Sequence, residues 1–128
     1  MTTEPRWLTD TTVLVIHAQQ IERFGGAHGV RDQHVMRSVL ARPQQRWNYD
    51  SSADLAHLAA LYLVGLSQAQ GFVDGNKCTG LACALVFLAL NEAALHVDGA
   101  ALYALTMRVA INAAEDGEVA TYFRDRLS

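Results

Sequence analysis

Residues Lys77 to Leu90, KCTGLACALVFLAL, form the most apolar stretch of the sequence. At 3.6 residues per turn, a helix with this sequence is apolar on almost every side. A helix without a polar face is typical of the interior of a protein, because no side of it suits contact with water. We therefore predict that residues 77–90 form the buried central helix of a small helical domain. Asn91 is expected to end this helix.

The rest of the chain shows helical spacing of apolar residues and no sustained alternation of a β-strand. This spacing predicts five further helices, over residues 9–24, 32–43, 54–69, 100–113 and 118–127. We expect Pro43 to close the second of them, and the polar segment PQQRWNYDSS that starts there to form an ordered loop or a short extended piece. Because no repeat or interior linker interrupts the pattern, residues 1–128 are predicted to form one all-α domain of about six helices.

Composition limits the classes of function that this chain can have. Hydrophobic residues make up 51% of the 128 residues, and the formal net charge is -3, so direct binding to nucleic acid is not expected. The first residues, MTTEPRWLTD, lack the basic and apolar regions of a secretory signal. The longest apolar run, Leu81 to Leu90, is too short to cross a bilayer. We expect a cytoplasmic protein that does not enter a membrane.

The loop QGFVDG, residues 70–75, directly precedes the apolar helix. The first turn of a helix exposes unpaired N–H groups and about half a positive charge, so it can bind an anion. Gly75 permits a positive φ or the close approach of a ligand. Asn76 and Lys77 add an amide and an ammonium group to this first turn, where a cation is unfavourable unless an anion binds beside it. The pattern therefore indicates a phosphate site.

Two other side chains of the loop fit such a site. Asp74 is placed to hold Mg²⁺, a hard cation that takes carboxylate and phosphate oxygens together. Phe72 is expected to point inward and anchor the loop. A structural interpretation stays open beside the functional one, because Asp-Gly-Asn is also an ordinary turn and helix start, and Lys77 can simply be solvated.

Cysteine and histidine residues add few candidates for chemistry. Cys78 and Cys83 lie about 140° apart on one helix, so they cannot form a disulfide with each other. Cys78 is either a reactive thiol, with a pKa lowered by the helix start, or a buried inert one. His17 is expected to be a hydrogen-bonded core histidine, whereas His28, in the loop GGAHG, stays open as a catalytic base.

The motif FVDGNK, followed by an apolar helix that ends in FLALN, resembles the Fic/Doc family, and in particular its Doc toxins of toxin–antitoxin modules. The segments IHAQQIERFGGAHGVRD and SVLARP resemble the first two helices of that family. The resemblance runs from about residue 8 to residue 127. It implies a Fic/Doc-type helical domain whose loop holds the phosphates of a nucleotide.

The resemblance also implies a reaction and a set of roles. Fic members mostly transfer AMP, but position 77 is lysine as in the Doc branch, which transfers phosphate from ATP to a threonine of elongation factor Tu and thereby inhibits translation. Asp74 would hold Mg²⁺, Asn76 would contact phosphate and Lys77 would shape the anion pocket. The flap that docks a target peptide would correspond to Gln45, Arg46, Trp47, Asn48 and Tyr49.

Two positions depart from the family's motif. Gln70 stands where the family has the histidine that takes a proton from the attacking hydroxyl, and losing such a base costs about 10²–10⁴ in rate. Cys78 stands where the family has an arginine that clamps phosphate through two hydrogen bonds. We therefore expect an impaired Doc-type phosphotransferase. The alternatives are a catalytically inactive binding module of the same fold, and transfer of another phosphate-containing group with a base from outside the motif.

The resemblance further implies a protein partner. Phd-type antitoxins fold a disordered segment onto their toxin, and the peripheral C-terminal helices, with Tyr103, Met107, Tyr122 and Phe123, are candidates for that surface. Alternatively, these residues belong to the ordinary core. A homodimer is compatible with the pattern, which does not require one.

Overall fold

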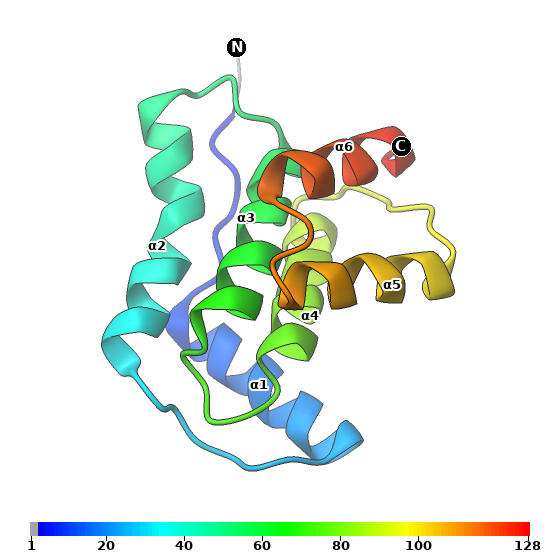
Figure 1. Cartoon of the computed structure of the whole chain (residues 1–128). Coiled ribbons are helices and arrows are strands. Elements are labelled where there is room, and N and C mark those ends of the chain that lie inside the picture. The colour runs from blue at the N-terminus through cyan, green and yellow to red at the C-terminus, as the bar shows by residue number, and fades with distance from the viewer. Residues whose placement is uncertain (1–2) are drawn as a thin grey trace.

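The computed structural model describes residues 3–128, and all of its regular structure is helical. Its six helices are α1 (Asp10–Phe24), α2 (Gln33–Tyr49), α3 (Leu55–Ala69), α4 (Asn76–Leu90), α5 (Gly99–Ala110) and α6 (Asp116–Arg126) (Figure 1). Within the described chain, β-pairing is limited to the isolated bridges Val30–Phe72 and Leu95–Leu127. The predicted all-α fold is confirmed. None of the helices described has the length and apolar character needed to cross a bilayer.

Side-chain caps begin most of the helices where the sequence predicted them. Thr9 accepts a hydrogen bond from the backbone N–H of Thr12 before α1, and Asp32 accepts one from Val35 before α2. Asp54 accepts one from the N–H of His57 before α3. A cap of this kind stabilises a helix by about 1 kcal/mol because it satisfies an N–H group that has no partner within the helix. α4 is different, since Gly75 precedes it and offers no side chain.

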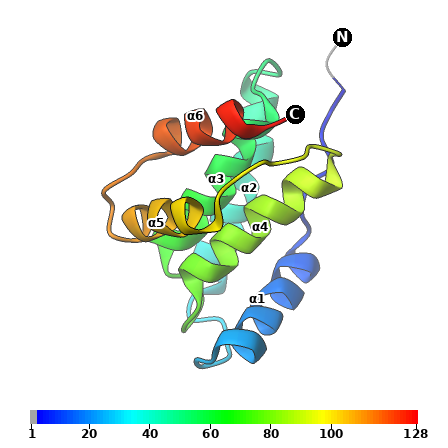
Figure 2. The same cartoon turned by 90° about the vertical axis from the view of Figure 1, so that its right-hand side faces the viewer.

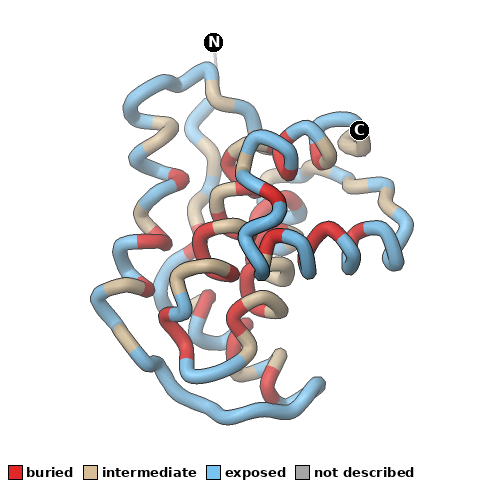
Figure 3. The backbone as a smooth tube through the Cα atoms, in the orientation of Figure 1, coloured by how far each residue is buried: buried red, intermediate tan, exposed pale blue. Residues whose placement is uncertain are grey.

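The most deeply buried helix is α3, which corrects the prediction that residues 77–90 form the central element. α3 packs against α2, α4, α5 and α6, and buried residues follow one another along it (Figures 1 and 3). α4 is buried on the side that faces α3, but α1 and α5 leave part of its opposite side uncovered (Figure 2). An apolar pattern on all sides does not reveal which side a neighbour covers, so the sequence could not separate the two helices.

Helices α3 and α4 approach closely because Gly80 has no side chain. A Cβ atom at Gly80 would lie 2.8 Å from Oγ of Ser67 and 2.9 Å from the carbonyl oxygen of Leu63. Both distances are shorter than any ordinary contact of a carbon atom, so a larger residue would push the helices apart. This contact fixes the position of the loop that joins the two helices.

The prediction that Pro43 closes the second helix is wrong. α2 continues through Pro43 to Tyr49, so residues 45–49 are its last turns and not a loop. A proline inside a helix removes one hydrogen bond, but here its ring is buried with Val39 and Leu40. Further along, Trp47 packs edge-on against Trp7, with ring centroids 6.4 Å apart. The burial of these apolar side chains offsets the lost hydrogen bond.

Candidate functional site

The loop between α3 and α4 borders a small cavity at the start of α4. The cavity has a volume of about 180 Å³, and we call it the loop cavity; it is lined by Ser67, Gln70, Val73, Asp74, Gly75, Asn76, Lys77 and Ala110. Five of the predicted site residues thus lie together. Typical small-molecule sites have volumes of roughly 300–1,000 Å³. The loop cavity is therefore of a size for a phosphate group with a few water molecules, and a larger ligand would extend out of it.

The first turn of α4 leaves its N–H groups free. Gly75 adopts the left-handed conformation, with φ 74° and ψ 21°, and makes no side-chain capping bond. The first hydrogen bond of the helix runs from the N–H of Thr79 to the carbonyl of Gly75, at 2.9 Å. The N–H groups of residues 76–78 consequently have no acceptor within the helix. This turn has the donors and the positive dipole end that an anion requires.

Lys77 adds a cation to the same turn. Its ammonium group forms no ion pair with any side chain in the part of the chain that the structure describes, and no acidic residue lies in the first turn of α4. A cation at the N-terminal end of a helix opposes the helix dipole. The position of Lys77 on the loop cavity is thus unfavourable for the helix alone and favourable once an anion binds.

Asp74 is held by backbone amides on both of its carboxylate oxygens. Oδ1 accepts a hydrogen bond from the N–H of Gly75 at 2.9 Å, and Oδ2 accepts one from the N–H of Ala27 at 3.3 Å. Gly26 makes room for this carboxylate, because a Cβ there would lie 2.7 Å from Oδ2. Within residues 3–128, no three metal-ligating side chains converge on one point. Mg²⁺ at Asp74 would therefore take its other ligands from phosphate and water, as this ion commonly does.

Asn76 has a different role from the predicted one. Its side chain is buried, and Oδ1 accepts a hydrogen bond from the N–H of Phe72 at 3.0 Å. Nδ2 donates to the carbonyl of Phe72 at 3.0 Å and to Oε1 of Gln70 at 3.3 Å. Both amide hydrogens are thereby used, so the side chain has no free donor for phosphate. Asn76 holds the loop in shape, and its backbone N–H stays available to an anion.

Phe72 points inward as predicted and is 1% exposed. Its ring stacks on the imidazole of His17 from α1, with centroids 3.9 Å apart and planes 7° from parallel. Nε2 of His17 also lies 2.8 Å from the backbone carbonyl oxygen of Asp74. His17 is 4% exposed, so the prediction of a hydrogen-bonded core histidine is confirmed. These contacts attach the loop to α1.

Gln70 ends α3 in the left-handed conformation, with φ 58° and ψ 41°. Its Nε2 donates to the carbonyl of Ser67 at 3.2 Å, while its Oε1 accepts the bond from Asn76. The amide of Gln70 is therefore part of the hydrogen-bond network of the loop. An amide also has no useful basicity, so Gln70 lines the loop cavity without offering a catalytic base.

The loop that contains GGAHG lies beside the α3–α4 loop. Residues 25–32, here called the strap, join α1 to α2 and pair with the α3–α4 loop: the N–H of Val73 donates to Gly29 at 3.0 Å, and the N–H of Arg31 to Gly71 at 2.8 Å (Figure 1). Nε of Arg31 donates to the carbonyl of Gln70 at 2.7 Å. The glycines of GGAHG were the sequence signal for an unusual backbone here. The segment that they contact, residues 70–74, is about 40 residues away in the sequence and could not be predicted from them.

The residues predicted to form the docking flap lie away from the loop cavity. Gln45, Arg46, Trp47, Asn48 and Tyr49 form the C-terminal end of α2, whereas its N-terminal end lies near the α3–α4 loop (Figure 1). Trp47 contacts Trp7, which stacks on Phe87. Phe87 is about 16 Å along α4 from Asn76. The strap, and not the end of α2, contacts the α3–α4 loop that borders the cavity.

Cys78 does not line the loop cavity. It faces a second hollow of about 600 Å³, here called the α4 groove, which is lined by Gln20, Arg23 and Phe24 of α1, by Lys77, Cys78, Leu81, Ala82, Leu85 and Val86 of α4, and by Tyr103 of α5. Lys77 lines both hollows. Cys83 lies on the other side of α4, where burial raises the pKa of its thiol to about 12 and makes it unreactive. His28 is paired with Glu22 at 3.2 Å and does not reach the loop cavity.

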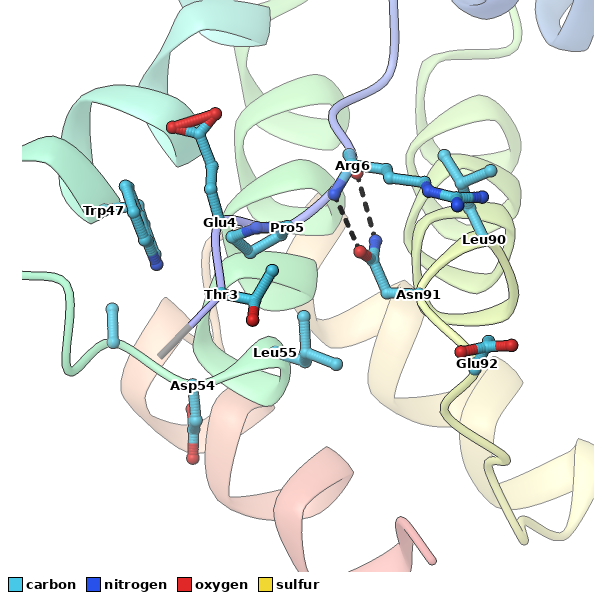
Figure 4. Close-up of a pocket in the computed structure, with 11 residues that line it drawn as sticks. Thr3, Glu4, Pro5, Arg6, Trp47, Asp54, Leu55, Leu90, Asn91 and Glu92 are labelled. Carbon is cyan, nitrogen blue, oxygen red and sulfur yellow. Dashed lines mark hydrogen bonds between the residues drawn. The ribbon is translucent and has the colours of Figure 1, made fainter. Parts of the chain in front are cut away.

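A third hollow, of about 510 Å³, lies where the N-terminal segment crosses the end of α4 (Figure 4). There the N–H of Arg6 donates to Oδ1 of Asn91 at 2.8 Å, and Nδ2 of Asn91 donates to the carbonyl of Arg6 at 3.0 Å. The carboxylates of Glu4, Asp54 and Glu92 line this hollow. Arg6 also lines it, and Asp54 is paired with Arg124, so Glu4 and Glu92 leave a small excess of negative charge that does not favour a phosphate.

Known proteins resemble this chain over more than half of its length. Residues 7–88, which include α1 to α3 and all but the last two residues of α4, match the Fic/DOC family. The chain is 34% identical over 86 residues to "Protein kinase doc" of Escherichia phage P1, a match that spans 67% of this chain and 68% of the phage protein. It is 38% identical over 76 residues to "Toxin Doc" of Mycolicibacterium smegmatis, spanning 59% of this chain and 58% of that protein. The chain belongs to the Fic/DOC family.

Proposed function

We propose that this protein is a Doc-like toxin that binds the phosphates of ATP in the loop cavity and transfers a phosphoryl group to a hydroxyl of a protein. The observation that carries the proposal is the uncapped start of α4, where free N–H groups and the unpaired Lys77 meet beside Asp74. The name "Protein kinase doc" of the phage relative supports phosphoryl transfer. A threonine of elongation factor Tu is the target that the resemblance suggests, and the cytoplasm is where it would be met.

Each group at the start of α4 has a role in this proposal. The N–H groups of residues 76–78 receive the phosphate oxygens, and Lys77 offsets charge on them, so both orient the nucleotide. Asp74 fits as a ligand of Mg²⁺ because its carboxylate borders the same cavity. Bound Mg²⁺ would supply charge neutralisation to the phosphates. Asp74 would hold the cation through its carboxylate, whose Oδ2 otherwise accepts, among the described residues, only the long hydrogen bond from Ala27 at 3.3 Å.

The proposed transfer is slow. No histidine lines the loop cavity, and Gln70 cannot accept the proton of an attacking hydroxyl. The absence of a positioned base lowers the rate by about 10²–10⁴. An inactive module that binds nucleotide without turning it over is the second candidate. It is favoured by the hydrogen bonds of Gln70 to Ser67 and Asn76, which use this side chain within the loop.

An antitoxin partner is part of the proposal, since the mycobacterial relative carries the name "Toxin Doc". The residues first considered for its docking differ in exposure: Phe123 is fully buried, and Tyr122 lies under the guanidinium of Arg126, whereas Tyr103 and Met107 are exposed. Of these, only Tyr103 lines the α4 groove. The apolar α4 groove is therefore the better surface for a partner helix.

The test combines binding with transfer. Titration calorimetry with Mg-ATP is expected to show binding to the protein, and labelled ATP is expected to mark elongation factor Tu weakly. The double variant Gln70→His, Cys78→Arg should raise the transfer rate by about 10²-fold or more. Adding Lys77→Met to that variant is the matched control and should abolish the gain. Binding without any transfer in either form would favour the inactive module, and no binding at all would refute both.

A further inference from the structure

His17 is a buried polar residue that the proposed reaction does not use. It lies in the middle of α1, on the face that carries Val13, Ile16 and Ile21 and packs toward α4. No residue of α1 lines the loop cavity, so His17 has no direct access to a ligand there. Burying a polar group is costly unless it forms a hydrogen bond. The partners of the His17 imidazole therefore indicate why a histidine stands at this buried position.

His17 contacts the α3–α4 loop at two places. Its ring stacks on Phe72, and its Nε2 lies 2.8 Å from the backbone oxygen of Asp74. A carbonyl oxygen only accepts hydrogen bonds, so Nε2 carries a hydrogen and donates it. The stack fixes where the ring lies, and the hydrogen bond fixes the direction of one carbonyl group.

That carbonyl group belongs to the peptide unit between Asp74 and Gly75. In a planar trans peptide, the C=O and the following N–H point in opposite directions. Because the carbonyl of Asp74 points to α1, the N–H of Gly75 points away from α1. Glycine accepts either sign of φ, so the backbone of Gly75, at φ 74°, does not by itself prevent this peptide from rotating over.

We infer that His17 is a positioning residue that holds the Asp74–Gly75 peptide with its carbonyl toward α1 and its N–H on the side of the Asp74 carboxylate, which borders the loop cavity. We call this contact the latch. In the flipped state a carbonyl oxygen would take the place of the N–H and repel an oxyanion. The N–H of Gly75 also holds Oδ1 of Asp74 at 2.9 Å, so a flip would release the carboxylate as well. The consequence for phosphate binding rests on the proposed function, whereas the latch itself is a property of the backbone.

Three variants separate the hydrogen bond from the packing. His17→Phe keeps a ring that can stack on Phe72 but has no donor, and His17→Gln keeps an N–H donor at the position of Nε2. His57→Phe is the matched control, because His57 is a partly buried histidine that bonds to Asp116 at 3.1 Å, remote from the loop. Inorganic phosphate is the probe, and the amide signals of residues 75–78 report binding in ¹⁵N-labelled protein.

The expected results differ between the variants. His17→Phe should bind phosphate about tenfold more weakly, and its Gly75 amide should show exchange on the microsecond to millisecond scale in relaxation dispersion. His17→Gln should restore most of the affinity and suppress the exchange, and His57→Phe should match the parent. A folded His17→Phe protein that binds phosphate as tightly as the parent and shows no exchange at Gly75 would contradict the inference that His17 holds this peptide.

Two further outcomes distinguish the latch from the proposed function. If the parent binds no phosphate but His17→Phe introduces exchange at Gly75, the latch stands and the proposed function fails. If His17→Phe does not fold, the parent alone decides: a hydrogen-bonded Nε2–H of His17 that exchanges slowly with solvent supports the latch, and a rapidly exchanging one contradicts it.

Discussion

Helices α3 and α4 lie side by side, but their first turns are built in opposite ways. Asp54 precedes α3, and its carboxylate accepts hydrogen bonds from the N–H of His57 and from Nε and Nη2 of Arg124 in α6. α4 begins with Gly75, has no side-chain cap and carries Lys77 in its first turn. At the start of α3, the protein itself therefore supplies both a hydrogen-bond acceptor for the helix and a partner for the carboxylate. The start of α4 leaves donors and a cation unused, as expected for a site that an outside anion completes.

The loop before α4 is nevertheless rigidly built, and Asn76→Ala tests this with the largest expected effect. Removal of the amide leaves the buried N–H and C=O of Phe72 without partners, which should lower the free energy of unfolding by about 2–3 kcal/mol. Asn48→Ala, at an exposed position near the end of α2, is the control and should change little. Denaturant unfolding measures both. A loss below about 0.5 kcal/mol for Asn76→Ala would mean that the amide does not hold the loop.

Lys77→Met tests whether the start of α4 serves a ligand and not the fold. We expect phosphate affinity to fall by about 10- to 100-fold, because a charge-assisted hydrogen bond is lost. Stability should stay the same or rise by a few tenths of a kcal/mol, since a cation at this end opposes the helix dipole. Isothermal calorimetry and thermal melts give the two quantities. If Lys77→Met lowers stability but leaves phosphate affinity unchanged, Lys77 serves the fold and not a ligand.

Gly26→Ala sharpens the comparison at the strap, and Gly25→Ala is its matched control. Both glycines have positive φ, 116° and 85°, so alanine strains the backbone at either position by roughly 1–2 kcal/mol. Only at Gly26 would the new Cβ meet Asp74, 2.7 Å from Oδ2. Gly26→Ala should lose more stability than Gly25→Ala because of this added contact, and it alone should lose the dependence of ATP affinity on Mg²⁺. If ATP affinity depends on Mg²⁺ to the same extent in both variants, the strap does not position Asp74.

Asp54→Ala tests the capped helix and has the smallest effect. It should lower stability by about 1 kcal/mol at neutral pH and leave phosphate affinity unchanged. Hydrogen bonds from Arg124, and further from the N–H of His57, hold the pKa of Asp54 below its ordinary value of 3.8. A lowered folded-state pKa stabilises the fold fully above pH 3.8, and this contribution disappears as the pH falls through the folded value. The stability difference between parent and variant should therefore shrink in acid, as urea unfolding at several pH values would show.

Much of this fold could be predicted because its signals are local. Helical spacing and the caps Thr9, Asp32 and Asp54 act within a few residues, so the sequence indicated the helices and their starts. The prediction at Pro43 failed because burial of Trp47 and its neighbours, contributed by distant parts of the chain, outweighs the local cost of the proline.

The site was predictable as a set of residues but not as an arrangement. Glycine, aspartate and lysine around the start of an apolar helix were enough to indicate a candidate anion site, and these residues line one cavity. The role of Asn76 could not be predicted, since an amide in a first turn serves equally well to bind a ligand or to hold a loop. The strap and His17 were missed as parts of the site because their bonds to Gly71, Val73 and Asp74 join segments about 40–60 residues apart.

Amide chemical-shift mapping with inorganic phosphate, and then with Mg-ATP, is the most direct test of the difference between the two helix starts. The account predicts that the N–H signals of residues 76–78 move with saturable, salt-sensitive titration curves, while those of residues 55–57 at the start of α3 stay in place. Equal small shifts at both helix starts, or shifts centred on the end of α4 near Asn91, would contradict it.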